Sequence, residues 1–129
     1  MTIFKKELIS IGNNFYNLYS NEKDYPALIN GFYALKFYLK ALGKPLEVDN
    51  TVKDLFLNLE DDTKKRIVEG VTKIIGIDLV FPEILIGIEN IPKLPLSLDD
   101  ELKYSFNDMM KVLSALLEVA NKEIKNIEE

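Results

Sequence analysis

Residues 97–129 read SLDDELKYSFNDMMKVLSALLEVANKEIKNIEE, and their apolar residues recur every three or four positions. The recurring set is Leu102, Phe106, Met109, Leu113, Leu116, Ala120, Ile124 and Ile127. This spacing places the set along one face of a helix. The polar start at residues 97–100 is typical of a helix N-terminus. We therefore predict a long amphipathic helix that packs its apolar face against other helices.

The N-terminal segment shows the same periodicity and predicts a helix over about residues 2–20, with Thr2 as its N-cap. We expect its inward face to consist of Phe4, Leu8, Ile11, Phe15 and Leu18. Gly12 lies in the middle of this pattern, where a helix interior glycine costs about 1 kcal/mol relative to alanine. We expect Gly12 to allow a neighbouring helix to approach closely.

Residues 24–42 predict a second helix that begins with Asp24 as its cap and stops at Gly43, just before Pro45. Apolar residues occupy most sides of this segment. A helix that is apolar on most sides is buried on most sides. We therefore expect this helix to be the central one.

The middle of the chain predicts a short helix over residues 51–58. A further helix, capped by Asp61 or Asp62, should run to residue 75 with Ile67, Val71 and Ile74 inward. Residues 77–81 also fit a strand, but the spacing after Pro82 favours a short helix. Pro92 and Pro95 predict an extended connector. The whole pattern predicts one all-α domain over residues 1–129, an up-and-down four-helix bundle with one or two additional short helices.

Composition excludes several classes of chemistry. The chain has no cysteine and no histidine, and its net charge is −5. Disulfides, zinc–thiolate sites and nucleophile–histidine pairs are therefore absent, and nucleic-acid binding, which favours basic proteins, is disfavoured. We expect a protein that is not an enzyme and that needs no metal or cofactor. The N-terminus lacks a signal-peptide pattern and no long uncharged apolar run occurs, so we expect a cytoplasmic protein outside the membrane.

One stretch combines aromatic residues with lysines, FYALKFYLK at residues 32–40. Such interleaving is compatible with a pocket for a small ligand or nucleotide, lined by Tyr33, Lys36 and Lys40. The alternative, which we favour, is a core helix whose lysines reach the rim of the protein.

Two charged groups are also open to a functional interpretation. The basic triplet Lys64–Arg66 follows three acidic residues, which favours ordinary ion pairs on a helix surface. Asp99, Asp100, Glu101 and Asp108 offer oxygen ligands for a divalent cation. We favour stabilisation of the helix N-terminus for the first three and expect no metal.

Three stretches together resemble the HEPN superfamily, the helical "higher eukaryotes and prokaryotes nucleotide-binding" domains. Residues 34–44, ALKFYLKALGK, are similar to the family's second helix with its glycine, and residues 52–59, VKDLFLNL, to the short helix beyond it. Residues 102–108, LKYSFND, are similar to the opening of the final helix. The resemblance implies an up-and-down bundle, often dimeric, that binds a protein partner such as a nucleotidyltransferase.

The chain departs from the catalytic members of that superfamily. HEPN ribonucleases use an arginine followed four to six residues later by a histidine, whereas this chain has no histidine and its only arginine, Arg66, lies in another segment. The resemblance therefore implies a non-catalytic member. We expect an interaction or regulatory protein, with a ligand-binding bundle as the alternative.

Apolar residues remain outside the predicted inward faces, and large exposed apolar patches are rare on monomers. Either segment 77–97 or another chain has to cover them, and a second copy of the chain is the cover that we expect, which predicts a homodimer. These remaining residues are Ile3, Ile9, Tyr16, Tyr19, Met110, Val112, Leu117 and Val119.

Overall fold

The computed structural model describes residues 3–45, 50–76, 83–93 and 100–128 of the chain. Almost all of these residues are helical and none of them belongs to a strand, which confirms the all-α class. The elements are α1 (Ile3–Asn21), α2 (Asp24–Leu42), α3 (Val52–Leu57), α4 (Asp61–Ile75), α5 (Glu83–Glu89), a 3₁₀ helix η1 (Ile91–Lys93) and α6 (Asp100–Glu128). The predicted helix after Pro82 is confirmed as α5. The strand alternative at 77–81, the cap at Thr2 and the connector at Pro95 lie outside the described residues.

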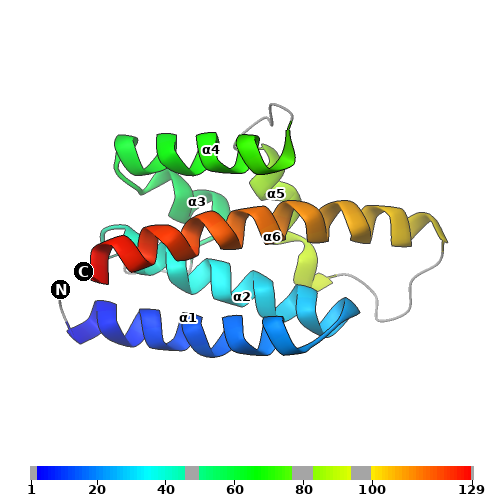
Figure 1. Cartoon of the computed structure of the whole chain (residues 1–129), viewed down its shortest axis with the longest axis horizontal. Helices are drawn as coiled ribbons and strands as arrows, with labels where there is room; N and C mark the ends of the chain where they lie inside the picture. Colours follow the sequence, from blue (N-terminus) through cyan, green and yellow to red (C-terminus); the bar gives the residue numbers. More distant parts are fainter. Residues whose placement is uncertain (1–2, 46–49, 77–82, 94–99, 129) are drawn as a thin grey trace.

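The long helices lie side by side (Figure 1). The most extensive contacts are those of α1 with α2, of α2 with α6 and of α6 with α4. The helix α1 therefore lies along one edge of the molecule and α4 along the other, with α3 and α5 packed near the middle. These contacts confirm a helical protein, but they do not confirm the predicted up-and-down four-helix bundle.

The core is built around α2, as its all-round apolar pattern predicts. Its side chains Leu28, Phe32, Leu35, Tyr38 and Leu39 are all buried. They meet buried leucines and an isoleucine from the second half of α6. The side chains of Leu102 and Phe106, which belong to the predicted face of the last helix, are outside the described part. No helix within the described ranges has the length and apolar character that crossing a bilayer requires.

The predicted inward face of α1 is partly wrong. Phe4, Ile11 and Leu18 are 56%, 39% and 46% exposed, and the buried residues are Leu8, Ile9 and Gly12 instead. The reason is the close contact that Gly12 makes with α2: a Cβ atom there would lie 2.8 Å from the Tyr38 ring. This contact turns the face of α1 that is centred on Gly12, rather than the predicted one, toward α2.

Other apolar residues also differ from the predicted burial. Ile74 and Ile127 are exposed at the ends of their helices. Ile9, Leu117 and Val119, which were expected to need cover from segment 77–97 or from a second chain, are buried within this chain. The remaining aromatic pair of α1, Tyr16 and Tyr19, packs against the core.

The helix ends show where local sequence signals succeed and fail. The predicted stops are confirmed: α2 ends before Gly43 and α4 before Gly76, whose φ is 86°. The predicted caps are not: Asp24, Asp61 and Asp62 lie inside the first turns of their helices, after Lys23 and Glu60. Their carboxylates still stabilise these helices, because they lie close to the partial positive charge of the helix N-terminus. Pro92 lies in η1 rather than in an extended connector.

Candidate functional site

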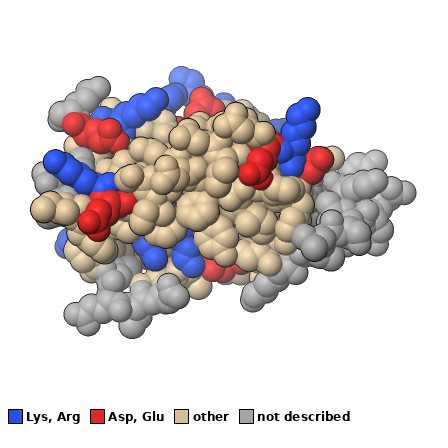
Figure 2. All heavy atoms as spheres, turned by 90° about the horizontal axis from the view of Figure 1, so that it is seen from below, with Lys and Arg blue, Asp and Glu red and all other residues tan. Residues whose placement is uncertain are grey.

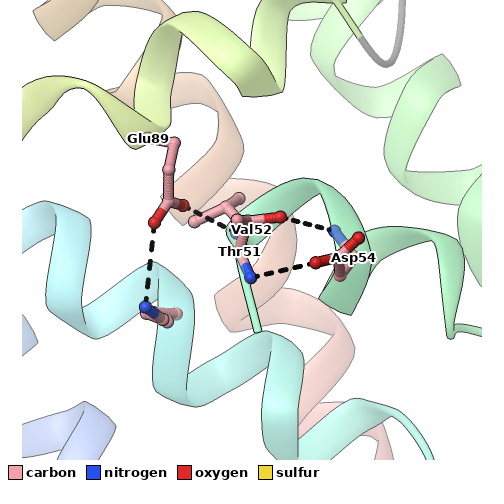
Figure 3. A network of polar contacts seen from close by, with 5 residues as sticks. Thr51, Val52, Asp54 and Glu89 are labelled. Atoms are coloured by element: carbon pink, nitrogen blue, oxygen red, sulfur yellow. Dashed lines mark hydrogen bonds and ion pairs between the residues drawn. The ribbon is translucent and has the colours of Figure 1, made fainter. Parts of the chain in front are cut away.

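Lys36 takes part in a structural network rather than in a pocket. Its Nζ lies 3.8 Å from Glu89 Oε1, and the other oxygen of Glu89 accepts a 2.7 Å hydrogen bond from the backbone N–H of Val52 (Figure 3). Thr51 and Asp54 complete a capping box at the same helix start. The spacing T-x-x-D at 51–54 is the signal that could have indicated this box. Glu89 thus joins α5 to the N-terminus of α3 and to α2.

Tyr33 belongs to an aromatic cluster at the contact of α1 and α2. Its ring centroid lies 5.5 Å from that of Phe15 and 5.2 Å from that of Phe32. Phe15 also stacks on Phe37, with the centroids 5.8 Å apart. Helical spacing accounts for these aromatic residues as packing residues, which is the interpretation we favoured from the sequence.

Lys40 is the predicted site residue that lines a cavity, while Tyr33 and Lys36 do not line it. The cavity has a volume of about 100 Å³ and is lined by Phe4, Leu8, Lys40, Lys44, Pro45, Asn50 and Leu55. Lys40 Nζ lies 5.3 Å from the centre of the Phe37 ring, within the range of a cation–π contact. The structure therefore distributes the three predicted residues along α2 instead of gathering them in one pocket.

The sequence prediction missed an exposed apolar line on α1. Phe4, Ile11 and Leu18, which we call the α1 stripe, follow one another at intervals of seven residues. Seven residues make almost two helical turns, so the three side chains lie on one line. From Leu8 to Asn21 the helix carries no charged residue. Figure 2, seen from the side on which α1 lies, shows uncharged side chains across the middle of this face and charged side chains around its edges.

Two residues of the basic triplet, Lys64 and Arg66, make structural contacts. Arg66 binds Glu123 of α6 through two hydrogen bonds, and Lys64 Nζ lies 3.2 Å from Asp61 Oδ1. The bond to Glu123 raises the pKa of Arg66 further above its usual range. Among the residues that the structure describes, no group of three or more acidic side chains is placed to hold a metal ion. Asp108 is exposed, and the side chains of Asp99, Asp100 and Glu101 lie outside the description.

Tyr38 is a fully buried tyrosine of α2 that lies between α1 and α6. Burial raises the pKa of its phenol, and the hydrogen bond from Asn121 acts in the opposite direction. Its hydroxyl donates to Asn13 Oδ1 at 2.7 Å. These bonds connect α2 to α1 and α6, so Tyr38 is a packing residue with satisfied polar contacts.

Comparisons with models of protein families, with curated proteins and with solved structures find no match to this chain.

Proposed function

We propose that this chain is a non-enzymatic interaction or regulatory protein that binds its partner through the α1 stripe. The observation that supports the proposal is the line of Phe4, Ile11 and Leu18, exposed along a helix that has extensive contact with α2 alone among the described elements. An exposed apolar patch on a small protein is a common mark of an interaction site.

The chemistry of the chain favours binding over catalysis. The usual general base near neutral pH is histidine and the strongest neutral-pH nucleophile is cysteine, and the chain has neither. Lys36 and Arg66 are engaged with Glu89 and Glu123. We expect the purified protein not to cleave RNA, with or without divalent metal. Cleavage that disappears when one of its own carboxylates or lysines is replaced would contradict this function.

The likeness to a non-catalytic HEPN domain, with a nucleotidyltransferase as partner, is part of the same proposal. Two features support it: the α2 segment that ends at Gly43 and the short helix α3 that follows it. The up-and-down bundle topology also remains a proposal, supported by four long helices, of which α1 and α2 are joined by only two residues, 22–23.

Photo-crosslinking tests the interaction function. A benzophenone amino acid at position 11 should capture a protein in an extract of the source cells, because Ile11 is at the middle of the α1 stripe. The same group at position 74 is the control, since Ile74 is 45% exposed on α4, away from α1. Equal capture at both positions, or none at position 11, would exclude a specific interaction through α1.

A small anionic ligand is the second candidate, because the Lys40 cavity combines two lysines with an apolar wall. Its volume suits a group the size of a phosphate or carboxylate rather than a whole nucleotide. We expect inorganic phosphate to raise the thermal stability of the wild-type chain and to have no effect on Lys40→Met. Lys65→Met is the matched control on α4. If all three proteins respond alike, the cavity is not a binding site.

A further inference from the structure

We infer that the partner of the α1 stripe is a second copy of this chain, bound with the two α1 helices antiparallel and Ile11 of each copy facing Ile11 of the other. This inference rests on the proposed function, because it names the partner of the same surface. It differs from the homodimer expected from sequence in the residues that form the interface.

The spacing of the stripe matches its own two-fold image. Phe4 and Leu18 lie seven residues before and after Ile11, about 10 Å along the helix in each direction. An antiparallel pair centred on Ile11 therefore places Phe4 of each copy opposite Leu18 of the other. Two-fold interfaces have this property, that one surface patch is complementary to itself.

Charge also favours a second copy over a strongly charged partner. The chain carries −5 overall, so two copies repel one another at long range. The stretch from Leu8 to Asn21 has no charge, and it lets two copies approach without like charges in direct opposition. An acidic or basic partner would find no opposite charge along this middle part of the helix.

The surface beside the stripe extends the contact. Phe15 is only partly buried, and it joins α1 to the partly buried Phe37 of α2. A stable interface of standard size buries about 800 Å² on each partner, which is close to one tenth of the 7812 Å² accessible surface of this chain. Helix α1, 19 residues long and therefore about 28 Å in length, supplies the long axis of such an interface, and aromatic residues of this kind are enriched at interface centres.

Cysteine cross-linking tests the register directly, because the natural chain has no cysteine. Under mild oxidation Ile11→Cys should give a disulfide-linked dimer. Phe4→Cys alone should not, since the two cysteines would be about 21 Å apart along the helix and a disulfide needs Cα atoms within about 7 Å. A mixture of Phe4→Cys and Leu18→Cys should cross-link. Ile74→Cys is the matched control and should form no disulfide-linked dimer; if it cross-links as efficiently as Ile11→Cys, the inference is wrong.

Light scattering of the uncross-linked protein gives the second readout. The wild-type chain and Ile74→Asp should show a mass that doubles with concentration, whereas Ile11→Asp should remain at one chain with an unchanged circular dichroism spectrum. If the wild-type mass is that of one chain at every concentration and Ile11→Cys does not cross-link, the inference that the partner is a second copy is wrong. The benzophenone experiment then distinguishes the two proposals: a different protein captured at position 11 keeps the interaction function, and no capture removes both.

Discussion

The carboxylate of Glu123 on α6 accepts two hydrogen bonds from the guanidinium of Arg66 on α4, at 2.8 Å from Nε and 3.2 Å from Nη2. The Glu123 side chain is only 8% exposed, whereas that of Arg66 is 54% exposed. A carboxylate in such a place is stable only while its charge is compensated. The pair therefore fastens α4 to α6 at a polar point beside the core.

Removing the guanidinium of Arg66 should lower the stability of the protein more than removing a neighbouring charge. We expect Arg66→Ala to lower the free energy of unfolding by about 1–3 kcal/mol, because it leaves the Glu123 carboxylate buried without its partner. Lys65→Ala, one residue away and exposed, should change it by less than about 0.5 kcal/mol. Urea denaturation measures both values, and equal effects would mean that the pair is only a surface contact.

A methyl group at Gly12 should separate α1 from α2. Its Cβ would lie 2.8 Å from two atoms of the Tyr38 ring, and the hydrogen bond to Asn13 holds that ring in place. We expect Gly12→Ala to be destabilising by about 1–3 kcal/mol. Gly87→Ala is the control: nothing lies within 4 Å of its Cβ position, so alanine should stabilise α5 by roughly 0.5–1 kcal/mol. Thermal unfolding that shifts in the same direction for both variants would contradict the close contact.

Truncation of a central leucine should be costly. Leu39 is 3% exposed in the middle of the core, and we expect Leu39→Ala to lower the free energy of unfolding by about 2–5 kcal/mol. Lys111→Ala, on the exposed side of α6, should change it by less than about 0.5 kcal/mol. Denaturant titration decides whether the faces of the two helices are assigned correctly, since similar values would show that they are not.

Loss of the Glu89 carboxylate should loosen the start of α3. Glu89→Ala removes the acceptor of the Val52 N–H and the partner of Lys36. The Val52 amide should then exchange its hydrogen at least several-fold faster in native-state exchange, while amides in the middle of α2 keep their rates. Glu69→Ala, an exposed carboxylate on α4, serves as the comparison. An unchanged Val52 amide would show that Glu89 does not hold this helix start.

The buried phenol of Tyr38 should make the protein less stable in alkali. Burial raises its pKa above the ordinary value, so the folded state binds the proton more strongly than the unfolded state. The contribution of this group is therefore complete below pH about 10 and is lost as the pH rises through the folded-state value. We expect Tyr38→Phe to be less stable at neutral pH, because two hydrogen bonds are lost, but to lose stability less steeply above pH about 10. Unfolding curves between pH 7 and 11 measure both slopes, and parallel slopes would contradict the burial effect.

The helices could be predicted from sequence because their signals are local. Periodicity located the long segments, and Gly43 and Gly76 marked two of the ends. The inward face of α1 could not be predicted in the same way, since the sets built on Leu8 with Phe4 or with Gly12 both fit a helical period. The contact of Gly12 with Tyr38, 26 positions later in the chain, decides between them.

The candidate site was less predictable than the fold for a related reason. Tyr33, Lys36 and Lys40 share one side of α2, but their partners come from α1, α5 and the ring of Phe37. Spacing along one helix indicates which side chains point the same way, and it contains no information on which other element meets each of them. The exposed α1 stripe was missed because the same three residues had been assigned to the core.

Helix α6 has a consequence for the order in which the chain folds. Among the described elements, α4 packs extensively on α6 alone, and α2 meets α6 through contacts such as Asn121 with Tyr38, 83 positions apart. During synthesis α1 and α2 can pair as soon as both have emerged, since only two residues separate them. The apolar side of α4 cannot be buried before α6 has been synthesised, so the nascent chain exposes that side until α6 packs against it.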